Sequence, residues 1–104
     1  MRHSIKKVRE LRNKAARRQG QRCYYCDRHM SNVAQMRCTA EHLVPRSERG
    51  PNSASNIVAA CLFCNAMRHR GYASLPPEHY REAVRAFISH GLWHEHHHAW
   101  HSLA

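Results

Sequence analysis

The sequence predicts a small α+β domain that folds around a bound metal ion. Three observations predict it: two CxxC pairs, two short strand-like segments between them, and amphipathic helical patterns on either side. With 104 residues the chain holds one small domain. A domain of this size buries only about 65% of the surface that its unfolded chain exposes. Its apolar core is therefore thin, and a bound metal ion would stabilise it.

The pattern of apolar and polar residues predicts the order helix, strand, strand, helix, helix. The first strand is expected to stop before Pro45, because proline cannot donate a ladder hydrogen bond. A stretch rich in Gly, Pro, Asn and Ser over residues 46–55 predicts the loop between the strands. The last helix has the clearest apolar stripe, which indicates that it packs on the domain. The expected elements are a helix over residues 4–19, strands over 38–44 and 56–61, and helices over 62–71 and 76–90.

The chain carries a formal charge of +10, and most of this excess lies near its N-terminal end. Residues 1–22 contain nine Lys or Arg and one acid, Glu10. Such a charge predicts a polyanionic partner or an acidic membrane surface. The first helix is then either a solvated surface helix or an arm that lies along phosphates, and the two interpretations are compatible.

The rest of the organisation follows from composition. No apolar run approaches the roughly 20 residues that span a bilayer, and no signal peptide is visible, so a cytoplasmic location with reduced thiols is expected. The C-terminal end is rich in His, which predicts weak binding of transition metals or simply a polar end whose Trp93 and Trp100 dock elsewhere. The predicted division is a basic N-terminal helix or arm (1–22), a core (23–71), an amphipathic C-terminal helix (72–91) and a His-rich tail (92–104).

The two CxxC pairs predict a structural zinc site. Two residues between thiols let both sulfur atoms turn toward one tetrahedral centre, and four thiolates leave no open position for a substrate. A redox dithiol is the weaker alternative, because two matched pairs favour joint coordination. Cys38 is left over and is interpreted as a small buried apolar residue. The predicted zinc ligands are Cys23, Cys26, Cys61 and Cys64.

The segment between the two pairs contains an acid and a histidine side by side, Glu41 and His42. Asn65 directly follows the last zinc cysteine, and His69 lies four residues later on the same helix face. The zinc site ties the start of this helix to the N-terminal cysteine pair, and the hairpin lies between them in the sequence. Glu41, His42, Asn65 and His69 are therefore expected to converge.

These groups have the chemistry for hydrolysing a phosphodiester bond. Neutral His42 can accept a proton from water near neutral pH. A divalent ion held by Glu41 and Asn65 can polarise a phosphoryl oxygen and stabilise the leaving oxygen. The planar guanidinium groups of Arg46 and Arg68 can hold flanking phosphates. Finally, the amide of Asn56 is expected to bond to the loop backbone and orient His42.

The stretch "CYYC…AEHLVPRSERGPNSASNIVAACLFCNAMRHRG" resembles the HNH endonucleases, which share a zinc-bound ββα-metal core similar to a treble clef. The resemblance covers residues 23–71 and rests on an acid–His pair, a downstream Asn, and CxxCN followed by a basic residue. It implies cleavage of DNA, with Mg²⁺, Mn²⁺ or another divalent ion. The family usually has Asp where this chain has Glu41. Carried over to this sequence, the roles are metal binding for Glu41 and Asn65, general base for His42, structural Asn for Asn56, the basic position for Arg68, and a possible further metal ligand for His69.

Three functions are compatible with these observations. The first is a metal-dependent endonuclease that cuts DNA, double-stranded in the leading interpretation, as a homodimer or within a larger complex. The second is a non-catalytic, zinc-stabilised module that binds nucleic acid through residues 1–22; Glu41 in place of Asp keeps this alternative open. The third, metal buffering by the His-rich tail, rests on composition alone.

Overall fold

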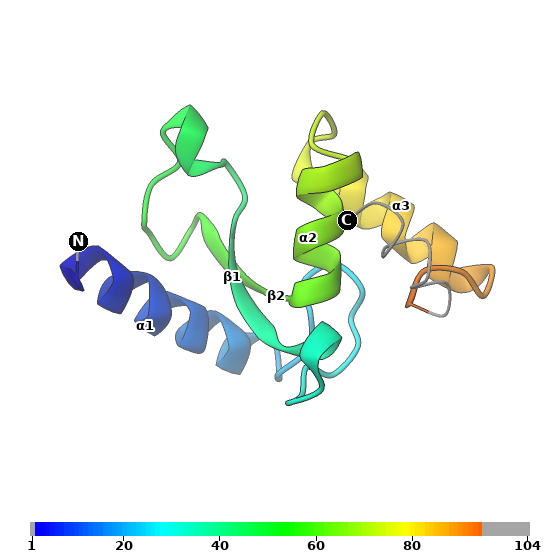
Figure 1. Cartoon of the computed structure of the whole chain (residues 1–104), viewed down its shortest axis with the longest axis horizontal. Coiled ribbons are helices and arrows are strands. Elements are labelled where there is room, and N and C mark those ends of the chain that lie inside the picture. Colours follow the sequence, from blue (N-terminus) through cyan, green and yellow to red (C-terminus); the bar gives the residue numbers. More distant parts are fainter. Residues whose placement is uncertain (1, 95–104) are drawn as a thin grey trace.

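A computed structural model of the chain describes residues 2–94. It confirms the predicted α+β class, with two strands and three α-helices (Figure 1). No helix in this described part is long and apolar enough to cross a membrane. Residues 95–104 of the predicted tail lie outside the described residues. In chain order the elements are α1 (Arg2–Arg18), η1 (Ala34–Met36), β1 (Cys38–His42), η2 (Arg46–Glu48), β2 (Ile57–Cys61), α2 (Leu62–Gly71) and α3 (Pro77–Ser89).

The two strands form an antiparallel hairpin in which Cys38 pairs with Cys61 and His42 with Ile57. All five residues of β2 are buried. Strand β1 ends at His42, two residues earlier than expected. The backbone N–H and C=O of Val44 bond to the side chain of Asn56 and not to a neighbouring strand.

Helices α1 and α2 lie on opposite sides of the hairpin (Figure 1). Alternation along β1 sends successive side chains to different sides. Thr39 accepts a hydrogen bond from Asn65 of α2, whereas Cys38 packs against the buried Ala15 and Ala16 of α1. The hairpin is thus covered on one side by the basic helix and on the other by the helix that carries the predicted site.

Helix α1 is fixed to the hairpin by one polar side chain just beyond its end. Gln19 donates from Nε2 to the carbonyl of Ala59 at 2.8 Å and accepts from the Ala59 N–H at 3.0 Å. The side chain thereby bonds to β2 as a neighbouring strand would, and it shares the Ala59 carbonyl with the backbone N–H of Tyr24. This contact holds the basic helix in a defined position next to β1.

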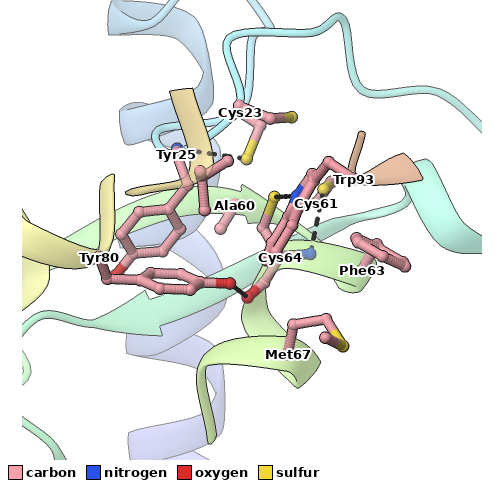
Figure 2. Packing of buried hydrophobic residues seen from close by; sticks show 11 residues of the cluster. Cys23, Tyr25, Ala60, Cys61, Phe63, Cys64, Met67, Tyr80 and Trp93 are labelled. Carbon is pink, nitrogen blue, oxygen red and sulfur yellow. Dashed lines mark hydrogen bonds between the residues drawn. The ribbon is translucent and has the colours of Figure 1, made fainter. Parts of the chain in front are cut away.

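The main core surrounds the cysteine quartet. Figure 2 shows Tyr25, Tyr80 and Trp93 gathered near the sulfur atoms, and all three are buried. Helix α3 joins this core through Tyr80, whose hydroxyl donates to the backbone carbonyl of Cys64 at 2.6 Å. Since cysteines make up much of the buried cluster, the core depends on what these thiols bind.

Candidate functional site

The four cysteines of the two CxxC pairs form one buried cluster. Their sulfur atoms all lie within 4.8 Å of one another. Sulfur atoms around a tetrahedral Zn²⁺ ion, with bonds of about 2.3 Å, lie about 3.8 Å apart. The donor set and its spacing therefore fit a closed structural zinc site, in agreement with the prediction.

Local backbone geometry prepares the sulfur atoms of both pairs to carry negative charge. The N–H of Tyr25 donates to Cys23 Sγ at 3.3 Å, and the N–H of Cys64 donates to Cys61 Sγ at 3.4 Å. Hydrogen bonds from the other three thiols lower the pKa of Cys26. Burial instead raises the pKa of Cys64 when no metal is bound. A bound cation would remove this difference by deprotonating all four thiols.

Trp93 and His94, the last two residues that the structure describes, contact the cysteine cluster. The indole Nε1 of Trp93 donates to Cys64 Sγ at 3.3 Å, and Nε2 of His94 lies 3.8 Å from Cys61 Sγ. Trp93 has φ = 93°, a conformation that costs a bulky residue about 1–3 kcal/mol. Its stacking on Phe87 and its bond to Cys64 hold it there. The sequence predicted that Trp93 docks, and the structure shows that its partner is the cysteine cluster.

Glu41 lies at the centre of a second buried cluster, between β1 and α2. Its side chain is only 2% exposed. Oε2 accepts hydrogen bonds from the hydroxyl of Tyr25 at 2.9 Å and from Nη1 of Arg68 at 2.8 Å. Oε1 lies 3.0 Å from Nε2 of His69. Burial and the charge of Glu41 raise the pKa of Tyr25, so the phenol remains a donor throughout the neutral range.

Arg68 points into the protein, which differs from the expected contact with a flanking phosphate. It is 3% exposed, and its guanidinium also donates to the carbonyls of His42 and Leu43. Burial acts to lower the pKa of Arg68, but the hydrogen bond and charge of Glu41 outweigh it and leave the pKa raised. Arg68 therefore stays charged and fixes both the Glu41 carboxylate and the end of β1. Arg46 is exposed on η2.

His42 points to a different partner from Glu41. Its Nε2 lies 2.8 Å from Oδ1 of Asn52. An amide oxygen only accepts, so Nε2 is the donor in this contact, and a neutral imidazole with this contact has its lone pair on Nδ1. Asn52 was not expected from the sequence to belong to the site, because an Asn in a loop rich in Gly, Pro and Ser predicts only a turn.

Asn56 fastens the loop that carries Asn52. It accepts from the N–H of Val44 at 2.8 Å and donates to the carbonyls of Val44 and Pro51, each at 3.0 Å. The loop also passes so close to itself that any side chain at Gly50 would overlap the Val44 carbonyl. These are the loop contacts expected of Asn56.

Asn65 faces β1 from the first turn of α2. Its Nδ2 donates to Thr39 Oγ1 at 3.0 Å and to the Ala40 carbonyl at 3.2 Å. Its Oδ1 makes no hydrogen bond to any residue in the described part of the chain. The structure thus joins Glu41, Arg68 and His69 directly, whereas Asn65 and His42 bond to other partners.

Residues 23–71 match the family model described as HNH endonuclease. This segment, slightly less than half of the chain, is similar to the HNH endonucleases. No curated protein and no solved structure gives a significant match to the chain. The HNH segment contains both CxxC pairs, the Glu41 cluster and the His42 loop, and it is thus a nuclease-type domain with a metal site.

Proposed function

We propose that the HNH segment is a metal-dependent endonuclease that hydrolyses phosphodiester bonds of DNA. The observation that carries the proposal is the pair formed by Glu41 Oε1 and His69 Nε2, 3.0 Å apart, at the end of the strand that presents His42. A carboxylate and an imidazole at this separation form a donor set for a divalent ion next to a candidate base.

The spacing supports a shared ion. Two neighbouring ligands of an octahedral ion, each at about 2.1 Å, lie about 3.0 Å apart. Asn65 adds an amide oxygen that is not otherwise bonded, and we assign it as a third donor with Glu41 and His69. Imidazole is a better ligand for transition metals than for Mg²⁺, whereas carboxylate and amide oxygens also suit Mn²⁺. We therefore expect Mn²⁺ or a later transition metal to support activity at lower concentration than Mg²⁺.

His42 acts as the general base in this proposal. Asn52 holds Nε2–H, so the unprotonated Nδ1 accepts the proton of the attacking water. A divalent ion, when bound, polarises the phosphoryl oxygen and stabilises the leaving oxygen. Arg68 and Asn56 do not touch the substrate in this scheme. Arg68 fixes the carboxylate of Glu41, and Asn56 fixes the loop that carries Asn52.

The test is cleavage of a supercoiled plasmid at low salt by zinc-loaded protein, with Mg²⁺, Mn²⁺ or EDTA added. Wild type should nick or linearise the plasmid with a divalent ion and not with EDTA, and His42→Ala should lose this activity. His29→Ala is the matched control, because His29 is exposed and lies outside the Glu41 cluster. No conversion by wild type with any metal ion would overturn the proposal.

One observation favours the second function, a non-catalytic zinc module that binds nucleic acid. Both oxygens of Glu41 already have protein partners: Oε2 is paired with Arg68, and Oε1 with His69. If these pairs persist when a divalent ion is added, the cluster is a structural ion pair and not a metal site. The plasmid assay separates the two functions, since the module would bind DNA and leave it uncut.

A further inference from the structure

A groove of about 690 Å³ lies between α1, the segment before β1, and the first half of β1. Three arginines line it: Arg12 and Arg17 from α1, and Arg37 from the residue before the strand. Asn13, Ser31 and Asn32 add polar groups, and no acid is among the described residues that line it. We propose that this groove binds the sugar–phosphate backbone of a nucleic acid within a few nucleotides of the cleaved bond.

The three guanidinium groups are available to a ligand. Arg17 and Arg37 are exposed, and their side chains make no hydrogen bond or ion pair with any other residue in the described range. Arg12 donates from Nε and Nη2 to Asn13, its exposed neighbour, and has further N–H groups to donate. Three like charges around one hollow repel each other, and an anion in the hollow would relieve this repulsion. The planar fork of arginine matches the oxygens of a phosphate.

The groove also has a defined position relative to His42. Cys38 and Ala40 line the groove, and alternation along β1 sends their side chains to the same side as that of His42. A strand rises about 3.3 Å per residue, so His42 lies about 7 Å beyond Ala40 and about 13 Å beyond Cys38. One strand of DNA carries a phosphate about every 3.4 Å along the helix axis. The groove can therefore hold phosphates only a few nucleotides from a bond placed at His42.

The two parts of this inference have different foundations. The distance to the cleaved bond rests on the proposed function, because it takes His42 as the catalytic base. Binding of the backbone in the groove requires only the three arginines. A binding measurement that involves no cleavage can therefore test the groove by itself.

The experiment measures fluorescence anisotropy of a labelled DNA duplex at several NaCl concentrations, with zinc-loaded, full-length His42→Ala protein so that no cleavage occurs. The groove variant adds Arg12→Gln, Arg17→Gln and Arg37→Gln. The matched control adds Lys7→Gln, Lys14→Gln and Arg18→Gln, which remove the same charge from exposed positions that helical spacing places on the other side of α1. Circular dichroism verifies that both variants remain folded.

We expect the groove variant to bind at least about tenfold more weakly near 0.1 M salt. The slope of log K against log salt should become shallower by about 2 to 3, at about 0.9 for each lost phosphate contact. The control should change the slope by less than about 1. Equal losses of DNA affinity in the two variants would contradict binding in the groove, because affinity would then depend on net charge alone.

The cleavage assay keeps this result separate from the proposed function. If only the groove variant loses affinity and the wild-type protein cuts no DNA, the groove is supported as a binding site and the proposed nuclease activity is contradicted. If the wild-type protein cuts DNA and the groove variant keeps its affinity, the nuclease activity is supported and binding in the groove is contradicted.

Discussion

The inward orientation of Arg68 gives a sharp prediction about stability. In Arg68→Met the new side chain has a similar length but no charge, so Glu41, which is 2% exposed in the wild-type structure, loses its 2.8 Å ion-pair partner. Removing one member of a buried pair costs about 3–5 kcal/mol, because the other charge stays buried. At about 4–8 °C per kcal/mol for a domain near this size, Tm should fall by at least about 12 °C.

The assay is urea or thermal unfolding of zinc-loaded protein followed by circular dichroism. Glu41→Gln combined with Arg68→Met should recover part of the loss, because a neutral amide can still accept the hydrogen bond of Tyr25. Arg46→Met is the surface control and should change stability by no more than about 0.5 kcal/mol. A loss below about 1 kcal/mol in Arg68→Met, together with weaker DNA binding, would refute the buried position and restore Arg68 as a phosphate contact.

The same pair predicts how stability depends on pH at the alkaline end. The folded state raises the pKa of Arg68 above its ordinary value. A raised pKa contributes stability that is fully present below the unfolded pKa and is lost as pH rises through the folded pKa. The ordinary arginine value is already about 12.5, so this contribution should be constant from pH 6 to 10 and disappear only in strong alkali. A difference between wild type and Arg68→Met that falls steadily across that range would contradict it.

Three further predictions concern the zinc site and the histidine loop. Removing zinc with a strong chelator should unfold the main core, because the four cysteines lie within it; unchanged circular dichroism would contradict this. Trp93→Phe should release zinc to a colorimetric chelator about two- to tenfold faster, since one N–H···S bond worth about 0.5–1.5 kcal/mol is lost; an unchanged release rate would show that only packing matters. Asn52→Ala should slow cleavage by about tenfold, whereas Asn52→Asp, which keeps an oxygen acceptor at this position, should restore it. Equal cleavage rates for Asn52→Ala and wild type would show that Asn52 does not orient His42.

Spacing in the sequence was enough to predict the zinc site and the hairpin. Two CxxC pairs have few other uses in one small domain, and two short strand segments joined by a polar loop favour an antiparallel hairpin. The amphipathic pattern of α3 likewise predicted the burial of Tyr80 and Val84. These features depend on local periodicity or on covalent spacing, which a sequence records directly.

The orientation of Arg68 was missed although a signal was present. Arg68 lies four residues after Cys64, so the two share a face of α2, and a zinc ligand must point inward. The same spacing of four residues predicted that Asn65 and His69 share a face of the helix. Tyr25 likewise lies between two buried zinc ligands, and its contact with Glu41 was not predicted.

Other contacts depend on tertiary structure that no local pattern encodes. Gln19 satisfies the backbone of Ala59, forty residues away, and a glutamine at the end of a helix gives no sign of this. Asn52 reaches His42 only because Gly50 and Asn56 shape the loop. The indole of Trp93 donates to Cys64 from a backbone conformation with positive φ, which composition does not predict.

Chemical rescue can test whether His42 accepts the proton during phosphodiester hydrolysis. Single-turnover cleavage of a labelled duplex is measured with zinc-loaded His42→Gly and Mn²⁺, over a range of imidazole concentrations and pH. Cleavage should return in proportion to the concentration of neutral imidazole, and imidazolium should have no effect. A folded, DNA-bound His42→Gly protein that imidazole cannot rescue, or that cuts as fast as wild type without imidazole, would contradict the assignment of His42 as the general base.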